Sequence, residues 1–171
     1  YGPEVYVEFL SDFMERSHKH GKPFFAYYSM ALAHDVTDDL KWQVPYTPGK
    51  DRWMNYGEMI ISLDEMVGKL MATLDRLKLR EDTIVFFSGD NGTAARSKLR
   101  HTGKKYEYEK VVVQQNGRNV PGGKGLLNDR GTHVPLIVSW PGKVTPNSVT
   151  QDLVDFSDWL PTVAELGGAE L

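Results

Sequence analysis

Hydrophobic residues recur every three or four positions in two long stretches of the chain, and this spacing predicts two amphipathic helices. The first helix is expected at residues 3–20 and the second at residues 54–78. The second has the clearer apolar stripe, which consists of Met59, Leu63, Met66, Leu70, Leu74 and Leu77. A shorter helix is expected at residues 158–166, with Asp158 capping its N-terminus.

Three apolar runs lack helical periodicity and are typical of strands that are covered on both faces. They occupy residues 23–30, 82–89 and 132–140. The helix at residues 54–78 separates the first two runs, so the order strand, helix, strand predicts a βαβ unit with parallel strands. The predicted fold class is therefore α/β, with a mainly parallel sheet flanked by helices in a single domain.

Two segments show neither the helical spacing of apolar residues nor a continuous apolar run. Residues 31–53 form a long connection, and long connections in compact domains often carry function. Residues 93–125 are basic and polar at first and end in a glycine cluster. Their cationic part, residues 96–105, fits either a solvated basic loop or a surface that contacts an anionic ligand.

Composition narrows the classes of function. A formal charge of −3 provides no general attraction to nucleic acid, and no apolar run approaches the length of about 20 residues that spans a bilayer. The absence of cysteine excludes disulfides, thiolate metal sites and a cysteine nucleophile within this chain. The chain opens at Tyr1 without an initiator Met, so we expect a processed protein or a piece of a longer one.

Polar residues follow two of the apolar runs, at the sheet edge where open α/β folds bind ligands. Asp90 and Asn91 end the second run, and their oxygen-bearing side chains suit a hard cation such as Ca²⁺ or Mg²⁺. Together with Gly92 they also fit a simple turn. His34 follows the first run and would lie at the same edge, although a lone histidine is often structural or solvated.

Lys124 stands among glycines in the sequence Pro-Gly-Gly-Lys-Gly, which lets a backbone approach an anion closely. The segment is not a P-loop, because the pattern Gly-x-x-x-x-Gly-Lys-Ser/Thr is missing. A solvated lysine in a flexible turn is the alternative. A cation beside an anion, with a histidine and a lysine nearby, would suit hydrolysis of a charged ester.

Residues 56–92 strongly resemble the type I sulfatases of the alkaline phosphatase superfamily, in which a similar helix precedes a strand ending in Ser-Asp-Asn-Gly or a close variant. Three further segments agree with that family in the same order: KPFFAYYSMALAH, GGKGLLNDRGTHVPLIVSWPG and DFSDWLPTVAELGG. The resemblance therefore covers nearly the whole chain.

The resemblance implies roles for four residues. Asp90 and Asn91 match the pair that ligates the active-site Ca²⁺, for which Mg²⁺ is the less favoured substitute. Lys124 matches the lysine that binds the sulfate ester. His34 matches the histidine that contacts the sulfate and protonates the leaving oxygen, so His34 and Lys124 are expected to be both catalytic and substrate-binding.

The chain departs from the family pattern in several places. No proline flanks His34, and residues 129–133 replace the usual acidic-Gly-Gly-x-Arg stretch with Asp-Arg-Gly-Thr-His. Residues 93–123 match no family motif and are expected to carry substrate preference. The family nucleophile, a formylglycine made within Cys/Ser-x-Pro-x-Arg, has no counterpart in this chain.

We therefore expect residues 1–171 to be the C-terminal portion of a sulfatase catalytic domain, without the N-terminal nucleophile segment and the small C-terminal domain. The parent would hydrolyse an aryl or carbohydrate sulfate ester, whereas the isolated chain should be inactive because it lacks the nucleophile. Sheet edges left exposed in such a fragment invite self-association.

Two other interpretations stay open: a phosphodiesterase or phosphonate hydrolase of the same superfamily, and a non-catalytic module that binds a sulfated glycan. The expected partner is a sulfated small molecule or glycan, not nucleic acid. The resemblance implies a periplasmic, secreted or lysosomal protein.

Overall fold

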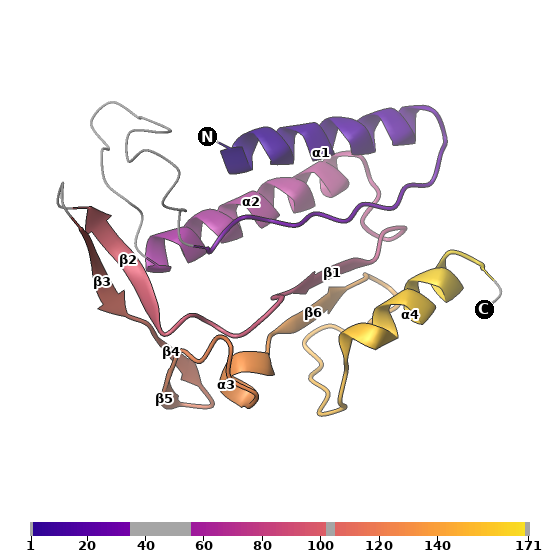
Figure 1. Cartoon of the computed structure of the whole chain (residues 1–171). Helices are drawn as coiled ribbons and strands as arrows, with labels where there is room; N and C mark the ends of the chain where they lie inside the picture. Colours follow the sequence, from indigo (N-terminus) through magenta and orange to yellow (C-terminus); the bar gives the residue numbers. More distant parts are fainter. Residues whose placement is uncertain (1, 35–55, 102–104, 170–171) are drawn as a thin grey trace.

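Two long helices lie side by side along one side of the molecule in the computed structural model, which describes residues 2–34, 56–101 and 105–169 (Figure 1). They are α1 (Gly2–Lys19) and α2 (Tyr56–Arg76), and both agree with the predicted helices to within two residues. None of the helices in these ranges is long and apolar enough to cross a membrane. The predicted connection at residues 31–53 lies mostly outside the described residues.

The apolar stripes of the two helices form the best-buried part of the core. Val7 of α1 and Met66 of α2 are each only 2% exposed, and Met14, Met59 and Leu74 are also buried. Each such side chain contributes about 1.5–3 kcal/mol by leaving water. Polar contacts join the same helices at their margins, where Lys69 Nζ donates to Glu4 Oε1 at 3.0 Å.

The strands of the described residues form three two-stranded antiparallel sheets. The pairs are β1 (Val85–Ser88) with β6 (Leu136–Ser139), β2 (Arg96–His101) with β3 (Tyr106–Lys110), and β4 (Val112–Gln115) with β5 (Arg118–Pro121). Two of the predicted strands are thus present, at β1 and β6. The segment expected to be irregular contains the other four.

The predicted parallel βαβ unit is not found among the described residues. Strand β1 pairs with β6 in antiparallel register, and residues 23–30 join no strand ladder. Phe24 packs edge-on against Phe13 of α1, with ring centroids 6.1 Å apart. Phe25 and Tyr27 of the same run are 70% and 84% exposed. The run is therefore covered on one side only, and no described strand provides the second neighbour that a buried parallel strand needs.

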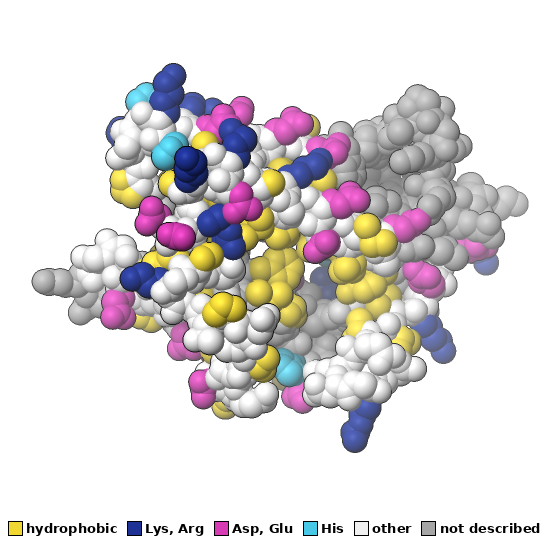
Figure 2. All heavy atoms as spheres, turned by 180° about the vertical axis from the view of Figure 1, so that it is seen from behind, with side chains coloured by type: hydrophobic (Ala, Val, Ile, Leu, Met, Phe, Trp, Pro, Cys, Tyr) yellow, Lys and Arg dark blue, Asp and Glu magenta, His cyan; other side chains and the backbone are white. Residues whose placement is uncertain are grey.

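Exposed apolar side chains are a general feature of this chain. Figure 2 shows several of them gathered near the middle of the face opposite to that seen in Figure 1. The exposed large apolar residues of the chain include Ile137, Leu153, Phe25 and Tyr27. Monomeric proteins rarely expose contiguous apolar surface on a large scale, so such a face is typical of one that another segment or molecule covers.

The C-terminal segment is held on β1 by aromatic packing. A short 3-10 helix, η1 (Phe156–Asp158), leads directly into α4 (Trp159–Leu166). The ring of Trp159 lies edge-on to that of Phe86, with centroids 5.0 Å apart. The predicted capping role of Asp158 is wrong for α4, because its carboxylate accepts from the Asp155 amide at 2.8 Å instead. Asp155 is the residue that caps this helical segment.

Candidate active site

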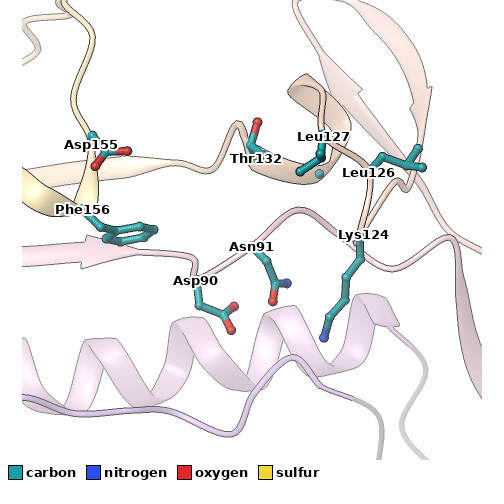
Figure 3. A pocket seen from close by; sticks show the side chains of 10 residues that line it. Asp90, Asn91, Lys124, Leu126, Leu127, Thr132, Asp155 and Phe156 are labelled. Carbon is teal, nitrogen blue, oxygen red and sulfur yellow. The ribbon is translucent and has the colours of Figure 1, made fainter.

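A pocket of about 490 Å³ lies beyond the end of β1 and gathers residues from three separate parts of the chain (Figure 3). Its polar side chains are Asp90, Asn91, Lys124, Thr132 and Asp155, and its apolar side chains are Leu126, Leu127 and Phe156. Three of the four residues that the sequence analysis singled out therefore lie around one space.

Asp90 and Asn91 follow β1 directly and present oxygen atoms to this pocket. Figure 3 shows the Asp90 carboxylate and the Asn91 side chain extending toward the same space. The Asn91 Nδ2 group donates to the carbonyl oxygen of Gly92 at 3.1 Å, which leaves the amide oxygen available as an acceptor. The pair thus offers one charged and one neutral oxygen donor.

Lys124 is anchored through its backbone to the segment that follows Asn91. The amides of Gly123 and Lys124 both donate to the carbonyl oxygen of Thr93, at 2.9 and 3.0 Å. Its side chain is exposed and extends to the side of the pocket where Asp90 and Asn91 lie (Figure 3). The ammonium therefore stands as a point charge beside the two oxygen donors.

Glycines let the segments of the site approach one another at backbone distance. The Gly92 amide donates to the Gly131 carbonyl oxygen at 2.8 Å, and a Cβ atom added to Gly92 would lie 2.0 Å from the Arg130 carbonyl oxygen. A Cβ atom on Gly131 would lie 1.9 Å from the Leu126 carbonyl oxygen. Both distances are far below any ordinary contact, so only glycine fits at these two positions.

The stretch that carries Lys124 continues into the short helix α3 (Asp129–Thr132), which was not predicted from the sequence. Asn128 caps it, because its side-chain oxygen accepts from the Arg130 amide at 3.1 Å. Thr132 lines the pocket, and its hydroxyl donates to the Asn128 carbonyl oxygen at 3.1 Å. The hydroxyl oxygen of Thr132 keeps acceptor capacity toward the pocket.

Asp155 and Phe156 complete the pocket from the C-terminal segment, and the sequence analysis missed both. Hydrogen bonds from Ser157, of which the backbone bond is the larger cause, lower the pKa of the Asp155 carboxyl. Asp155 therefore stays ionised at neutral pH. The signal that could have identified it is the spacing Asp-Phe-Ser-Asp, in which two acids three residues apart form a reciprocal capping box.

His34 does not line this pocket. It is exposed, at the end of the first described range, and its amide donates to the Ala31 carbonyl oxygen at 3.1 Å. Its predicted contact with a sulfate group therefore stays a prediction. So do the predicted roles of Asp90, Asn91 and Lys124, although these three residues do share a site.

The donor set partly fits a hard cation. Asp90 and Asn91 provide oxygen ligands of the kind that Ca²⁺ accepts, but Ca²⁺ takes six to eight such ligands in all. Within the ranges that the structure describes, no group of three or more His, Cys, Asp or Glu residues could hold a metal. The two residues therefore suit one side of a cation site.

Comparison with known proteins places the chain in a family. The sulfatase family model matches residues 2–169. Arylsulfatase A of Bos taurus is 32% identical over 97% of this chain and 29% of its own length, and N-acetylgalactosamine-6-sulfatase of Canis lupus familiaris is 29% identical over 96% and 28%. Steryl-sulfatase of Mus musculus is 31% identical over 88% of this chain and 22% of its own length.

The fold agrees with a solved structure. The crystal structure of Ps i-CgsB aligns with a TM-score of 0.66 and 24% identity, over 100% of this chain and 35% of that one. The chain spans less than a third of the length of the three relatives named above. The family match over nearly all of its residues confirms the resemblance inferred from the sequence, and the chain belongs to the sulfatase family.

Proposed function

We propose that the complete protein, meaning this chain together with the regions its relatives have outside the match, hydrolyses a sulfate ester. Within it, residues 1–171 form the C-terminal portion of the catalytic domain, and the nucleophile comes from another segment. The observation that supports this proposal is the shared pocket of Asp90, Asn91 and Lys124, which come from two loops that lie more than thirty residues apart.

Each of these residues has a chemical task in the proposal. Asp90 and Asn91 would hold one side of a Ca²⁺ ion, which would supply positive charge to the sulfate ester. The Lys124 ammonium stabilises the negative charge that these oxygens carry as the ester bond breaks. His34 supplies the proton that the leaving oxygen requires.

The substrate class follows from the relatives. Three of them are named for aryl, N-acetylgalactosamine-6-sulfate and steryl substrates, and the Ps i-CgsB protein has also been crystallised with the oligosaccharide k-i-k-neocarrahexaose. We infer an aryl or carbohydrate sulfate as the substrate of the complete protein. By the same likeness we infer a non-cytoplasmic site of action, in the periplasm, the lysosome or outside the cell.

The test is turnover by the complete protein with 4-nitrophenyl sulfate and, in parallel, 4-nitrophenyl phosphate. Sulfate release that falls about a hundredfold or more in both Asp90→Ala and Lys124→Ala would support the proposal. Asp129→Ala is the matched control, since Asp129 is an exposed acid near the site that does not line the pocket. Full activity in either site variant, or a preference for the phosphate ester, would contradict the site assignment or the reaction class.

A further inference from the structure

A pair of like charges faces across the hairpin β2–β3, next to the candidate active site. The register places Arg96 directly opposite Lys110, and both side chains are exposed. Neither has an acidic partner at ion-pair distance among the residues that the structure describes. Like charges directly opposite each other disfavour strand pairing, so a bound anion between them would remove a repulsion as well as gain two contacts.

The hairpin has an inner and an outer face, and the pair lies on the outer one. Successive side chains of a strand point to opposite faces. Ser97 and Val111 are buried at 3% and 5% exposure, whereas Tyr108 is 53% exposed and shares the face of Lys110. The outer face thus combines cationic groups with an exposed aromatic ring.

Hydrogen bonds tie this hairpin to the active-site loops. The Val111 amide donates to the Ala95 carbonyl oxygen at 3.1 Å, and the Gly122 amide donates to the Val111 carbonyl oxygen, also at 3.1 Å. Arg96 follows Thr93, the residue that anchors the Lys124 backbone, by three positions, which limits the separation of their Cα atoms to about 11 Å. A ligand longer than one sugar unit could therefore reach from the pocket to the hairpin.

We propose that Arg96, Lys110 and Tyr108 form a subsite that binds a second anionic group of an oligosaccharide substrate, beyond the ester that is cleaved. This inference rests on the proposed sulfatase function and specifies its substrate as a multiply sulfated oligosaccharide. The guanidinium of Arg96 and the ammonium of Lys110 take the sulfate oxygens, as charge-assisted hydrogen bonds. The ring of Tyr108 offers an apolar surface with a polar tip, which suits the face of a sugar.

A glycan fits these observations better than a nucleic acid. The chain carries a formal charge of −3, so it has no general attraction to a long polyanion. Two opposed cations beside one aromatic ring match a single anionic substituent on a ring, whereas nucleic acid binding follows from many phosphate contacts. The subsite therefore selects where a sulfated sugar sits.

The experiment uses the complete protein and compares two substrates. The double variant Arg96→Gln/Lys110→Gln is measured against Lys19→Gln/Lys22→Gln, which removes two exposed cations near the end of α1. With a sulfated carrageenan hexasaccharide, the subsite variant should raise KM about tenfold to a hundredfold, with kcat within about twofold. With 4-nitrophenyl sulfate, kcat/KM should stay within about twofold of the wild type. The control variant should match the wild type on both substrates.

A second variant, Tyr108→Leu, keeps both charges and should raise KM for the hexasaccharide by a smaller factor, about threefold to tenfold. An equal loss on both substrates, or no loss on the hexasaccharide, would overturn the subsite. If the wild type cleaves neither the hexasaccharide nor 4-nitrophenyl sulfate, the proposed function fails. The subsite is then tested by calorimetric binding of the hexasaccharide alone. Tenfold weaker binding of the hexasaccharide by the double variant would then support the subsite, and unchanged binding would overturn it. Duplex DNA is titrated in parallel, and a loss of DNA binding equal to the loss of hexasaccharide binding would also overturn it.

Discussion

The amide of Gly92 donates a 2.8 Å hydrogen bond to the carbonyl oxygen of Gly131, and this contact joins the loop after β1 to helix α3. Gly131 in turn lies against the Leu126 carbonyl, so the loop that carries Lys124 packs on the same point. The positions of Asp90, Asn91 and Lys124 relative to one another therefore depend on backbone contacts that admit no side chain.

Gly131→Ala should lower the free energy of unfolding of the complete protein by about 1–3 kcal/mol or more, because the added Cβ forces backbone apart. Gly89→Ala is the matched control, since its Cβ would lie at an ordinary 3.6 Å from Val134. Urea unfolding monitored by circular dichroism measures both. Equal stability of the two variants would contradict the close packing at Gly131.

Asp90→Asn should weaken Ca²⁺ binding to the complete protein by about tenfold to a hundredfold, because it removes a ligand charge but preserves the side-chain shape. Removal of Ca²⁺ with a chelator followed by calorimetric titration gives the affinity. The control is Asp129→Asn, which changes the same charge on an exposed side chain outside the pocket lining. Similar affinity in wild type and Asp90→Asn would exclude Asp90 as a ligand.

The two long helices and the end of strand β1 were predictable because their signals are local. The stripe containing Met59, Met66 and Leu74 repeats at helical spacing, and these residues are indeed buried. Asp90 and Asn91 stand at the end of an apolar run, and the strand β1 ends just before them. The helices and the end of β1 needed only neighbouring residues, whereas the roles of Asp90 and Asn91 were inferred from the family resemblance and stay predictions.

Strand pairing was not predictable in the same way, because it depends on partners far apart in sequence. Residues 23–30 have the composition of a buried strand, yet no described strand pairs with them. The β4–β5 hairpin did have a local signal that the sequence analysis overlooked. Asn116 and Gly117 have φ angles of 50° and 73°, and Asn-Gly between short apolar runs is a strong hairpin signal.

A chain of residues 1–171 produced on its own should self-associate at micromolar concentration, because among the described residues β1 and β6 form only a two-stranded sheet with unpaired edges. Ile137→Lys should reduce this association, since Ile137 is 58% exposed on β6 and a charge there opposes edge pairing. The control is Val149→Lys, which adds the same charge to an exposed residue outside the strands and should leave the association unchanged. Sedimentation velocity measures the association. A monomeric wild-type chain at micromolar concentration would contradict this prediction.

Asp155 should make the stability of the complete protein depend on pH in the acidic range. Hydrogen bonds from Ser157, including one from its amide at 2.9 Å, lower the pKa of the folded-state carboxyl below its usual range. A depressed folded-state pKa contributes stability that is fully present above the unfolded-state value, about pH 4, and is lost as the pH falls through the folded-state value.

The melting temperature of Asp155→Ala should therefore fall below that of the wild type at neutral pH, and the difference should narrow below about pH 4. Asp155→Asn keeps a side-chain oxygen that accepts from the Ser157 amide but does not titrate, so it retains most of the cap at every pH. Differential scanning calorimetry between pH 7 and pH 3 measures both variants. Protonation of Asp155 in the wild type removes the same stabilisation that Asp155→Ala lacks at every pH. A difference in melting temperature between the two proteins that widens with acidity would therefore contradict the predicted direction of the pH dependence.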